Sequence, residues 1–444
     1  MLDRDRSYEI IDFVLKEAEG HPTRVMITSQ EEGLTRYANS EIHQNVAEDV
    51  TTVTITVTGD KKRSRLSTTA YDEEGLREAV ADAVENLNYI PPGEDQPPPS
   101  TEPQEILADH YNEALAAGFE VEKRAQILKD CLDTLGEGYQ AYGKFSHKES
   151  RLSFGNSEGV RRFARNNEVD FSALVSAAGG TGYASTGSSR PDDLDVPGTF
   201  ARAYEKAKMN QDREGVEPGR YTVILEPLAV GNILTFMSFV GFSARMVQNR
   251  ASFLTGKMGE KVFDERITIV DDHMDENTVS LPFDFEGYPR QKVTLVDRGV
   301  VRGMVHDSAS AQKDGVESTG HSVDMPQRGG IPLHLVMAGG EGDLEQMIAG
   351  TEEGLLITRF HYMNVVNPRE ALMTGLTRDG VFRVAGGKIE GAVKNMRFTD
   401  SMLRALNHVA GITAERERTP FFFGNYCVPA IKIEGFHFTG ATEA

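Results

Sequence analysis

Hydrophobic and polar residues alternate along this chain with either a helical period or a strand period. The period predicts which segments form helices and which form strands. Apolar residues recur at helical spacing over 8–18, and Gly20 with Pro22 ends that pattern. Asp72 begins a second helical pattern, which runs to residue 87 and has acidic residues in its first turn. The chain order and spacing predict further helices over 121–135, 200–209, 231–248 and 344–349.

Runs that are rich in β-branched residues or that alternate strictly predict the strands. The longest β-branched run is 50–58, with the sequence VTTVTITVT. Between residues 353 and 401, short apolar runs alternate with glycine-containing turns, which predicts a meander of antiparallel strands. Other expected strands lie at 24–29, 34–37, 139–146, 149–154, 160–178, 221–225, 267–270, 293–297, 300–306, 333–337 and 430–438.

Two stretches stand out because they contain few apolar residues. The stretch 179–190 (GGTGYASTGSSR) is rich in glycine and serine and predicts a flexible loop. A phosphate-binding loop is the alternative, but the stretch lacks the Lys-Ser/Thr pair of a P-loop and the spacing of a dinucleotide fingerprint. The proline-dense segment 88–103 predicts a stiff, extended and exposed connection.

The order of these elements predicts an α+β fold in two domains. Residues 1–218 form an expected N-terminal α+β domain, with segment 88–103 as a linker within it. Pro218 and Gly219 mark the expected boundary. Residues 219–444 are dominated by strands and predict a β-rich C-terminal domain with a large curved antiparallel sheet or open barrel. A length of 444 residues agrees with more than one core.

Composition and charge narrow the range of partners. The formal net charge is −21, so the surface repels phosphate backbones and argues against nucleic-acid binding. No apolar run reaches the ~20 residues that cross a bilayer, and the first residues lack the apolar core of a signal peptide. We therefore expect a soluble, cytoplasmic protein without membrane contacts. Cys131 and Cys427 are too few for a disulfide framework.

The residues themselves carry little recognisable chemistry. The eleven histidines include no His-Glu-x-x-His motif, which a zinc hydrolase of that type needs on one helical face. His273 lies in a polar turn, and His361 lies on an apolar run where a core or interface role is favoured over a metal ligand. No G-x-S-x-G elbow is present, and Cys427 is expected to be a buried thiol rather than a nucleophile.

Charged residues between 353 and 401 are candidates for a cavity or an interface. Arg359, Arg378 and Asp379 are interpreted either as an ion pair that holds the turns or as the lining of a substrate groove, and the structural role is favoured. His361 belongs with the same candidate set. From composition and motifs alone, the chain is an acidic α+β protein of undetermined function.

A longer pattern adds a resemblance to a known family. The sequence EGLLITRFHYMNVVNPREALMTGLTRDGVF, followed by GGKIEGAVKNMRFTDS up to Ser401, resembles the C-terminal signature of the TldD/PmbA family, also called TldD/TldE or modulator-of-DNA-gyrase proteins. The turn NSEGVRR at 156–162, the stretch GTGYAST at 180–186 and the run 282–287 fall in the family's order.

The resemblance implies a two-domain α+β fold and dimers, typically of a TldD-type and a TldE-type chain. It also implies a metallopeptidase that degrades or trims unfolded peptides inside a closed cavity. In the TldD-type chain, a His-Glu-x-x-x-His helix binds zinc. The equivalent segment here is 231–248, where Thr235, Phe236 and Val240 replace the motif, and no histidine lies between Tyr221 and Arg250.

This chain therefore resembles the TldE/PmbA-type subunit, without zinc of its own and with zinc expected in a TldD-like partner. The partner is expected to be that subunit or a second copy of this chain, and the ligand an unfolded peptide. One alternative is an active peptidase with relocated ligands such as His334, His361 and Cys427. Another is a non-enzymatic homodimeric binding protein.

Overall fold

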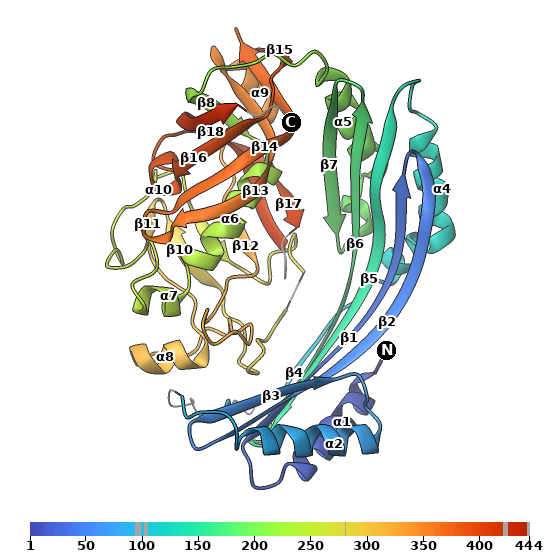
Figure 1. The fold of residues 1–444 in the computed structure, drawn as a ribbon, viewed down its shortest axis with the longest axis vertical. Helices are drawn as coiled ribbons and strands as arrows, with labels where there is room; N and C mark the ends of the chain where they lie inside the picture. The colour runs from blue at the N-terminus through green and yellow to red at the C-terminus, as the bar shows by residue number, and fades with distance from the viewer. Residues whose placement is uncertain (94–98, 102–104, 280, 421–424, 442–444) are drawn as a thin grey trace.

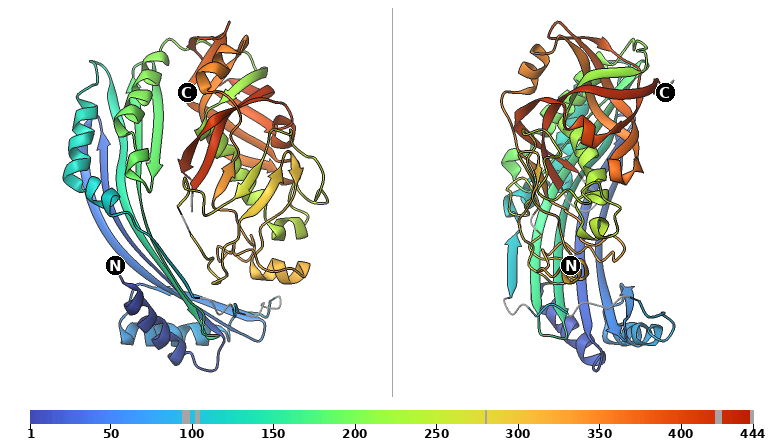
Figure 2. Two further views of the ribbon diagram at one scale, coloured as in Figure 1. Left: turned by 180° about the vertical axis from the view of Figure 1, so that it is seen from behind. Right: turned by 90° about the vertical axis from the view of Figure 1, so that its left-hand side faces the viewer.

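Two large β-sheets that face each other organise the molecule. The computed structural model describes residues 1–444 except 94–98, 102–104, 280, 421–424 and 442–444. The first sheet bows around the second half of the chain, and the two halves form a near-closed ring (Figure 1). The same arrangement is visible from behind in the left view of Figure 2.

The first sheet has seven long or medium strands in the order β3-β2-β1-β5-β6-β4, with β7 also paired to β6. Its pairings are antiparallel apart from that of β4 with β6. The strands are β1 (Thr23–Ala38), β2 (Glu41–Gly59), β3 (Lys62–Thr68), β4 (Ile106–His110), β5 (Gln140–Asn156), β6 (Arg161–Ala177) and β7 (Gly180–Ser188).

Helices cover the convex face of this sheet at both of its ends (Figure 1). At one end Ile11 and Leu76 pack on the β-branched side chain of Val53, and at the other Phe200 packs near Phe171. The expected N-cap at Asp72 is confirmed, because its side chain accepts a hydrogen bond from the Gly75 amide. These helices are α1 (Arg4–Glu17), α2 (Glu73–Asn86), α3 (Glu113–Gly118), α4 (Val121–Leu132) and α5 (Val196–Met209), with the 3₁₀ turn η1 (Pro191–Asp193).

The second sheet has eleven strands in a mixed arrangement, and part of it curls into a closed circuit of pairings through β8, β13, β14, β16 and β18. Its strands are β8 (Gly219–Leu225), β9 (Ile269–Asp271), β10 (Val293–Asp297), β11 (Val300–Val301), β12 (Leu335–Met337), β13 (Glu353–Asn367), β14 (Leu372–Ala385), β15 (Lys388–Ala392), β16 (Met396–Ser401), β17 (Val409–Pro420) and β18 (Asn425–Ala441).

The helices of the second half are short, apart from one that lies inside the curl. Helix α6 (Pro227–Val240) packs on β13, β17 and β18, and Ile233, Leu234 and Met237 belong to the largest hydrophobic core of the chain. The others are α7 (Ala244–Gln248), α8 (Ser308–Asp314), α9 (Leu344–Ala349) and α10 (Met402–Ala405), with the turn η2 (Pro368–Glu370). No helix in the described part of the chain is long and apolar enough to cross a bilayer.

The predicted fold class is confirmed as α+β, with a β-rich second half. The large sheet is mixed rather than wholly antiparallel, because β8 pairs in parallel with β13 and β12 with β18. The expected meander over 353–401 is present as β13 to β16, although β16 pairs with β14 instead of β15. The boundary expected near Gly219 remains a prediction; the first strand of the second sheet begins at that residue.

Several expected turns inside the first sheet are absent. The separate strands predicted at 24–29 and 34–37 are one strand, β1, and those predicted at 139–146 and 149–154 are one strand, β5. The residues between the predicted strands are mostly polar. Their backbone groups nevertheless pair with the neighbouring strand, so β1 and β5 each continue without a break. Segment 88–103 falls partly outside the described residues, so its predicted role is unchanged.

The flexible loop predicted at 179–190 is wrong, because Gly180–Ser188 forms strand β7 along the edge of β6. The glycines are there for packing rather than for flexibility. A Cβ atom on Gly182 would lie 2.2 Å from the Ala203 carbonyl oxygen and 2.3 Å from the Ala207 amide nitrogen. Helix α5 therefore packs backbone to backbone against β7, which only glycine permits.

This close approach predicts a large cost for a single methyl group. We expect Gly182→Ala to lower the free energy of unfolding by about 2–4 kcal/mol, because both clashing atoms belong to the backbone of α5 and neither moves freely. The measurement is denaturant unfolding followed by circular dichroism. Gly440→Ala on β18 is the matched control, since nothing lies within 4 Å of its Cβ position, and it should change the value by less than about 0.5 kcal/mol. Equal stability of the two variants would contradict the packing argument.

Candidate functional site

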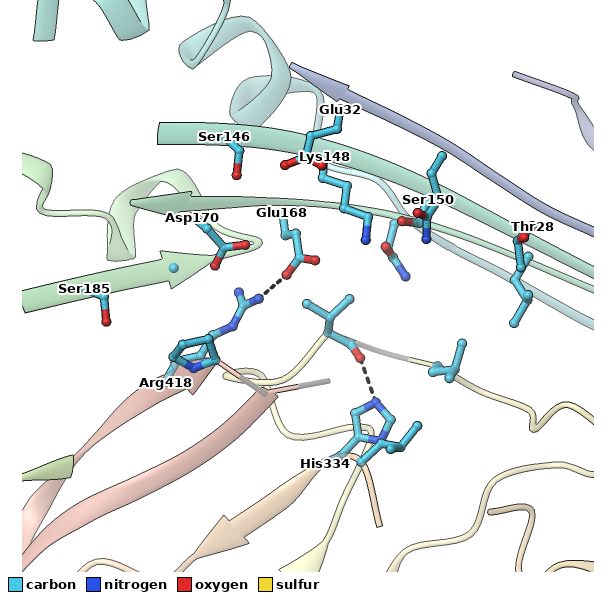
Figure 3. A pocket seen from close by; sticks show the side chains of 18 of the residues that line it. Thr28, Glu32, Ser146, Lys148, Ser150, Glu168, Asp170, Ser185, His334 and Arg418 are labelled. Atoms are coloured by element: carbon cyan, nitrogen blue, oxygen red, sulfur yellow. Dashed lines mark hydrogen bonds and ion pairs between the residues drawn. The ribbon is translucent and has the colours of Figure 1, made fainter. Parts of the chain in front are cut away.

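A cavity of about 520 Å³ lies between the concave face of the first sheet and the second half of the chain. Strands β1, β5, β6 and β7 supply one wall, and the segments around Leu281, His334 and Arg418 supply the other. Figure 3 shows the lining side chains from both walls pointing toward each other. This size suits a small molecule or a short stretch of peptide.

The alternation of the strands determines which residues reach the cavity. On β5 and β6 the even-numbered residues from Lys144 to Leu152 and from Ala164 to Ser172 line it. The odd-numbered Phe145, Val169 and Val175 point the other way and pack under α4 and α5. Because successive side chains in a strand point to opposite faces, one sequence pattern gives the sheet a polar concave face and an apolar convex face.

Charged side chains of both signs lie at the centre of the cavity. Glu168 on β6 forms an ion pair with Arg418 on β17, which crosses from one wall to the other (Figure 3). Lys148 lies opposite Glu168 on β5, and Asp170 lies two residues further along β6 on the same face. Burial and the neighbouring charge of Glu168 raise the pKa of Asp170.

Polar contacts join the two halves of the chain at each end of the cavity. At one end, the carboxylate of Asp324 receives ion pairs from Arg24, Arg63 and Arg65 of the first sheet. The Asp324 side chain is only 7% exposed, so these charges are shielded from solvent. Sequence analysis did not identify this cluster, because its members lie about 260 to 300 residues apart and form no local motif.

The other end contains residues that the sequence had singled out. Asp379 is 2% exposed and accepts a hydrogen bond from Thr181 Oγ1 on β7 at 2.7 Å. Arg359 Nε donates to the same carboxylate at 2.6 Å, and its guanidinium lies 4.1 Å from the centre of the Tyr183 ring. The structure therefore brings Arg359 and Asp379 together as a contact between the two sheets.

The remaining two candidates lie beside this contact. Arg378 Nε is 3.8 Å from Asp379 Oδ1, and its side chain is 44% exposed. His361, two residues beyond Arg359 on β13, is half-buried, and its ring contacts Tyr362 with centroids 4.1 Å apart. None of the four residues lines the 520 Å³ cavity.

The helix that the resemblance singled out is packed in the core. Thr235 and Val240 are each 7% exposed, and Phe236 is partly buried against the same core. Thr235 Oγ1 donates to the Gly231 carbonyl at 2.9 Å, and Ser238 Oγ donates to the Thr235 carbonyl at 2.7 Å. The buried hydroxyls of this helix are thus satisfied by its own backbone, and Tyr426 Oη lies 2.9 Å from Ser238 Oγ.

Buried histidines behind the cavity wall were not predicted as a group. His321 Nε2 lies 2.9 Å from Asp271 Oδ1, and the backbone amide of His334 donates to Asp271 Oδ2 at 2.9 Å. His334 Nε2 lies 3.0 Å from the Val279 carbonyl, so this nitrogen carries the proton. Burial, together with the nearby Arg290 guanidinium, lowers the pKa of His334 to about 3. His334 is therefore a neutral part of the structure at physiological pH.

The residue types that bind metals do not meet in a suitable group. In the described ranges, no three side chains of His, Cys, Asp or Glu are placed to hold one ion. Cys427 is fully buried, and burial raises the pKa of its thiol to about 11. Burial therefore favours the protonated thiol, as expected for a buried cysteine.

Comparison with known proteins points to one family. The profile of the PmbA/TldA metallopeptidase C-terminal domain matches residues 218–440. The uncharacterized protein MJ0231 of Methanocaldococcus jannaschii is 33% identical over 174 residues, which cover 37% of this chain and 41% of that protein. This match therefore spans less than half the length of that relative.

Two other similarities extend over most of the chain. The metalloprotease PmbA of Escherichia coli O157:H7 is 23% identical over 406 residues, covering 86% of this chain and 85% of that protein. The crystal structure of TldE from Thermococcus kodakarensis matches 98% of this chain and 100% of that chain, with a TM-score of 0.85 at 20% identity. The second similarity establishes a shared fold.

The buried contact at Asp379 predicts a cost that depends on charge. Asp379 has a φ of 58°, which asparagine adopts nearly as readily as aspartate. We therefore expect Asp379→Asn to keep the backbone conformation of β14 but weaken the contact to Arg359, lowering the free energy of unfolding by about 1–3 kcal/mol. Asp192→Asn, an exposed carboxylate on η1, should change it by less than about 0.5 kcal/mol. Chemical denaturation of both variants gives the comparison, and equal values would show that the contact is energetically neutral.

The low pKa of His334 predicts a pH dependence of stability. The unfolded chain binds a proton at this histidine near pH 6.5, whereas the folded chain does so only near pH 3. Stability is therefore fully present above pH 6.5 and falls as the pH drops toward 3, by up to about 1.4 kcal/mol per pH unit. His334→Gln keeps a donor for the Val279 carbonyl but does not titrate. The difference in unfolding free energy between wild type and variant should change with pH between 4 and 6.5, and a constant difference would contradict the assignment.

Proposed function

The chain belongs to the PmbA/TldD metallopeptidase family, and on this basis we propose that it is a TldE/PmbA-like subunit of a peptide-hydrolysing complex. In this proposal the zinc-binding subunit is a separate TldD-like chain, and the present chain contributes a wall of the space in which unfolded peptides are held. The heterodimer is the preferred assembly, and a homodimer is the alternative. The complex is expected in the cytoplasm.

Helix α6 is the observation that carries this proposal. A catalytic zinc requires side chains with lone pairs pointed at one position, usually imidazoles, and a carboxylate near the attacking water. At the three replaced positions this helix has Thr235, Phe236 and Val240, which are buried or partly buried in an apolar core. Placing a charged, hydrated ion there would leave it without ligands and would desolvate it at high cost.

The cavity supports the peptide part of the proposal. Its wall is one face of a sheet, so it presents rows of side chains rather than unpaired backbone groups. Hydroxyl and charged groups of both signs lie in the centre, and apolar side chains such as Leu281 and Phe285 lie toward one end. A surface of this mixed kind recognises a flexible polar chain with some apolar side chains, which describes an unfolded peptide.

The proposal predicts that zinc and activity follow the partner. The full chain, purified alone after zinc supplementation, should contain less than about 0.1 zinc per chain and should not cleave a fluorescent unfolded casein substrate. Mixing it with a TldD-like chain from the same host that has a His-Glu-x-x-x-His helix should form a complex with zinc and activity. Metal content is read by plasma emission, and assembly by light scattering after gel filtration.

Variants of the chain separate the proposal from its alternative. If His334, His361 and Cys427 were relocated ligands, the triple variant with alanine, alanine and serine would lose zinc and activity. We expect no change in the zinc content of the chain alone and at most a small change in the activity of the complex. About one tightly held zinc in the isolated wild-type chain would overturn the proposal, as would failure to associate with any TldD-like subunit of the host.

A further inference from the structure

Asp170 is an acidic group in the cavity that the protein leaves without a hydrogen-bond partner. Within the described residues its carboxyl makes no hydrogen bond and no ion pair, whereas Glu168 on the same strand face is paired with Arg418. The Asp170 carboxyl lies over Gly187 of β7, where a Cβ atom would come within 2.3 Å of Oδ1. The glycine therefore leaves room for the carboxyl to lie flat beside β7.

Two serines lie on the same sheet face as this carboxyl. Ser146 lies directly opposite Asp170 on β5, and Ser185 on β7 lies two residues from Gly187, which is opposite Asp170. Ser146 is only 2% exposed and lines the cavity. A hydroxyl at a cavity wall can accept a hydrogen bond from a ligand group.

The far end of the cavity has the opposite character. Leu152 and Ala164 are paired across β5 and β6, and apolar residues of the second half of the chain face them. From Asp170 to Ala164 the strand advances six residues, which is roughly 20 Å at 3.3 Å per residue. The cavity therefore has a polar end and an apolar end, separated by about the length of six residues of extended peptide.

We propose that this cavity binds an extended peptide by its ammonium group, which Asp170, Ser146 and Ser185 hold at the polar end while an apolar side chain occupies the other end. This inference rests on the proposed function, because it names the chemistry of the peptide that the cavity would accept. An ammonium group donates three hydrogen bonds, and one carboxylate with two hydroxyls supplies three acceptors. Its source is either the peptide's own amino terminus or a lysine side chain.

Charge explains why a cation is favoured over an anion at this end. Lys144, Lys148, Arg151 and Arg418 face the cavity together with Glu32, Glu168 and Asp170, and Arg151 is paired with Glu149, which lies outside the lining. Arg418 is already paired with Glu168, which leaves Asp170 as the carboxyl open to a ligand. Burial and the charge of Glu168 raise the pKa of Asp170, and a bound ammonium group would oppose this shift because it favours the ionised carboxylate.

Binding of labelled peptides to the full chain tests the proposal. Three seven-residue peptides of glycine and serine that end in phenylalanine, each with fluorescein at the carboxyl end, separate the possible sources. The first has a free amino terminus, the second is acetylated, and the third is acetylated but begins with lysine. Fluorescence anisotropy is measured with the chain alone and with the TldD-like subunit present.

We expect acetylation to weaken binding at least tenfold in the wild-type chain. If lysine restores the affinity, any accessible ammonium is accepted; if it does not, the site reads the amino terminus. Asp170→Asn should abolish the difference between free and acetylated peptides. Ser146→Ala should reduce that difference about three- to fivefold, and Asp192→Asn, which removes a charge outside the cavity, should leave it unchanged.

The pH dependence of peptide binding gives a second measurement, which would not change if Asp170 had only a structural role. Between pH 4 and pH 8 the ratio of the two affinities should rise with pH in the wild type as Asp170 ionises, and it should be flat in Asp170→Asn. Equal binding of free and acetylated peptides, or discrimination that survives in Asp170→Asn, would overturn the inference while leaving the proposed function intact. If none of the peptides binds in either assembly, the proposed function fails as well.

Discussion

The alternation of side chains along one set of long strands is the constraint on which the rest of the molecule depends. Even-numbered residues of β1, β5 and β6 all point to the concave face, and odd-numbered residues point to the convex face, with a regular register between β1 and β5. A slip of one residue would exchange Phe145 for Lys144 in the core under α4 and α5. The apolar convex face therefore fixes which polar groups line the cavity.

Polar contacts then determine how closely the second half of the chain approaches this face. The anchors at both ends of the cavity are aspartates, Asp324 and Asp379, and both adopt the left-handed backbone region, with φ of 60° and 58°. This conformation costs free energy for most residues but less for aspartate. At each position a buried carboxylate contacts cationic or hydroxyl groups of the first sheet, so local backbone geometry and contact between the halves depend on the same residue.

Local sequence patterns predicted the elements that are stabilised by contacts between residues close together in the chain. The cap at Asp72, the long β-branched run in β2 and the antiparallel strands between 353 and 401 were recognisable because their signals lie within a few residues. The strand β7 was misread because its glycines serve a packing contact with α5 that no local pattern encodes. The pair of Glu168 with Arg418 joins residues 250 positions apart, and the cluster at Asp324 is equally distant in sequence. The sequence indicated Arg359 and Asp379 as candidates only because charged residues interrupt an apolar stretch there.

The proposed division between recognition and catalysis agrees with where the polar groups of this chain are placed. His334 and Cys427 are buried, and burial favours the uncharged form of each side chain. The polar groups that remain open are carboxyl, hydroxyl and ammonium groups on a rigid sheet face, spaced at the pleat of the strands. Such groups bind a flexible chain by many modest contacts, and they do not polarise a peptide bond as a metal does. If another subunit supplies the zinc, this chain needs only the open cavity to bind the peptide. Helix α6 then carries no metal ligands and packs in the core.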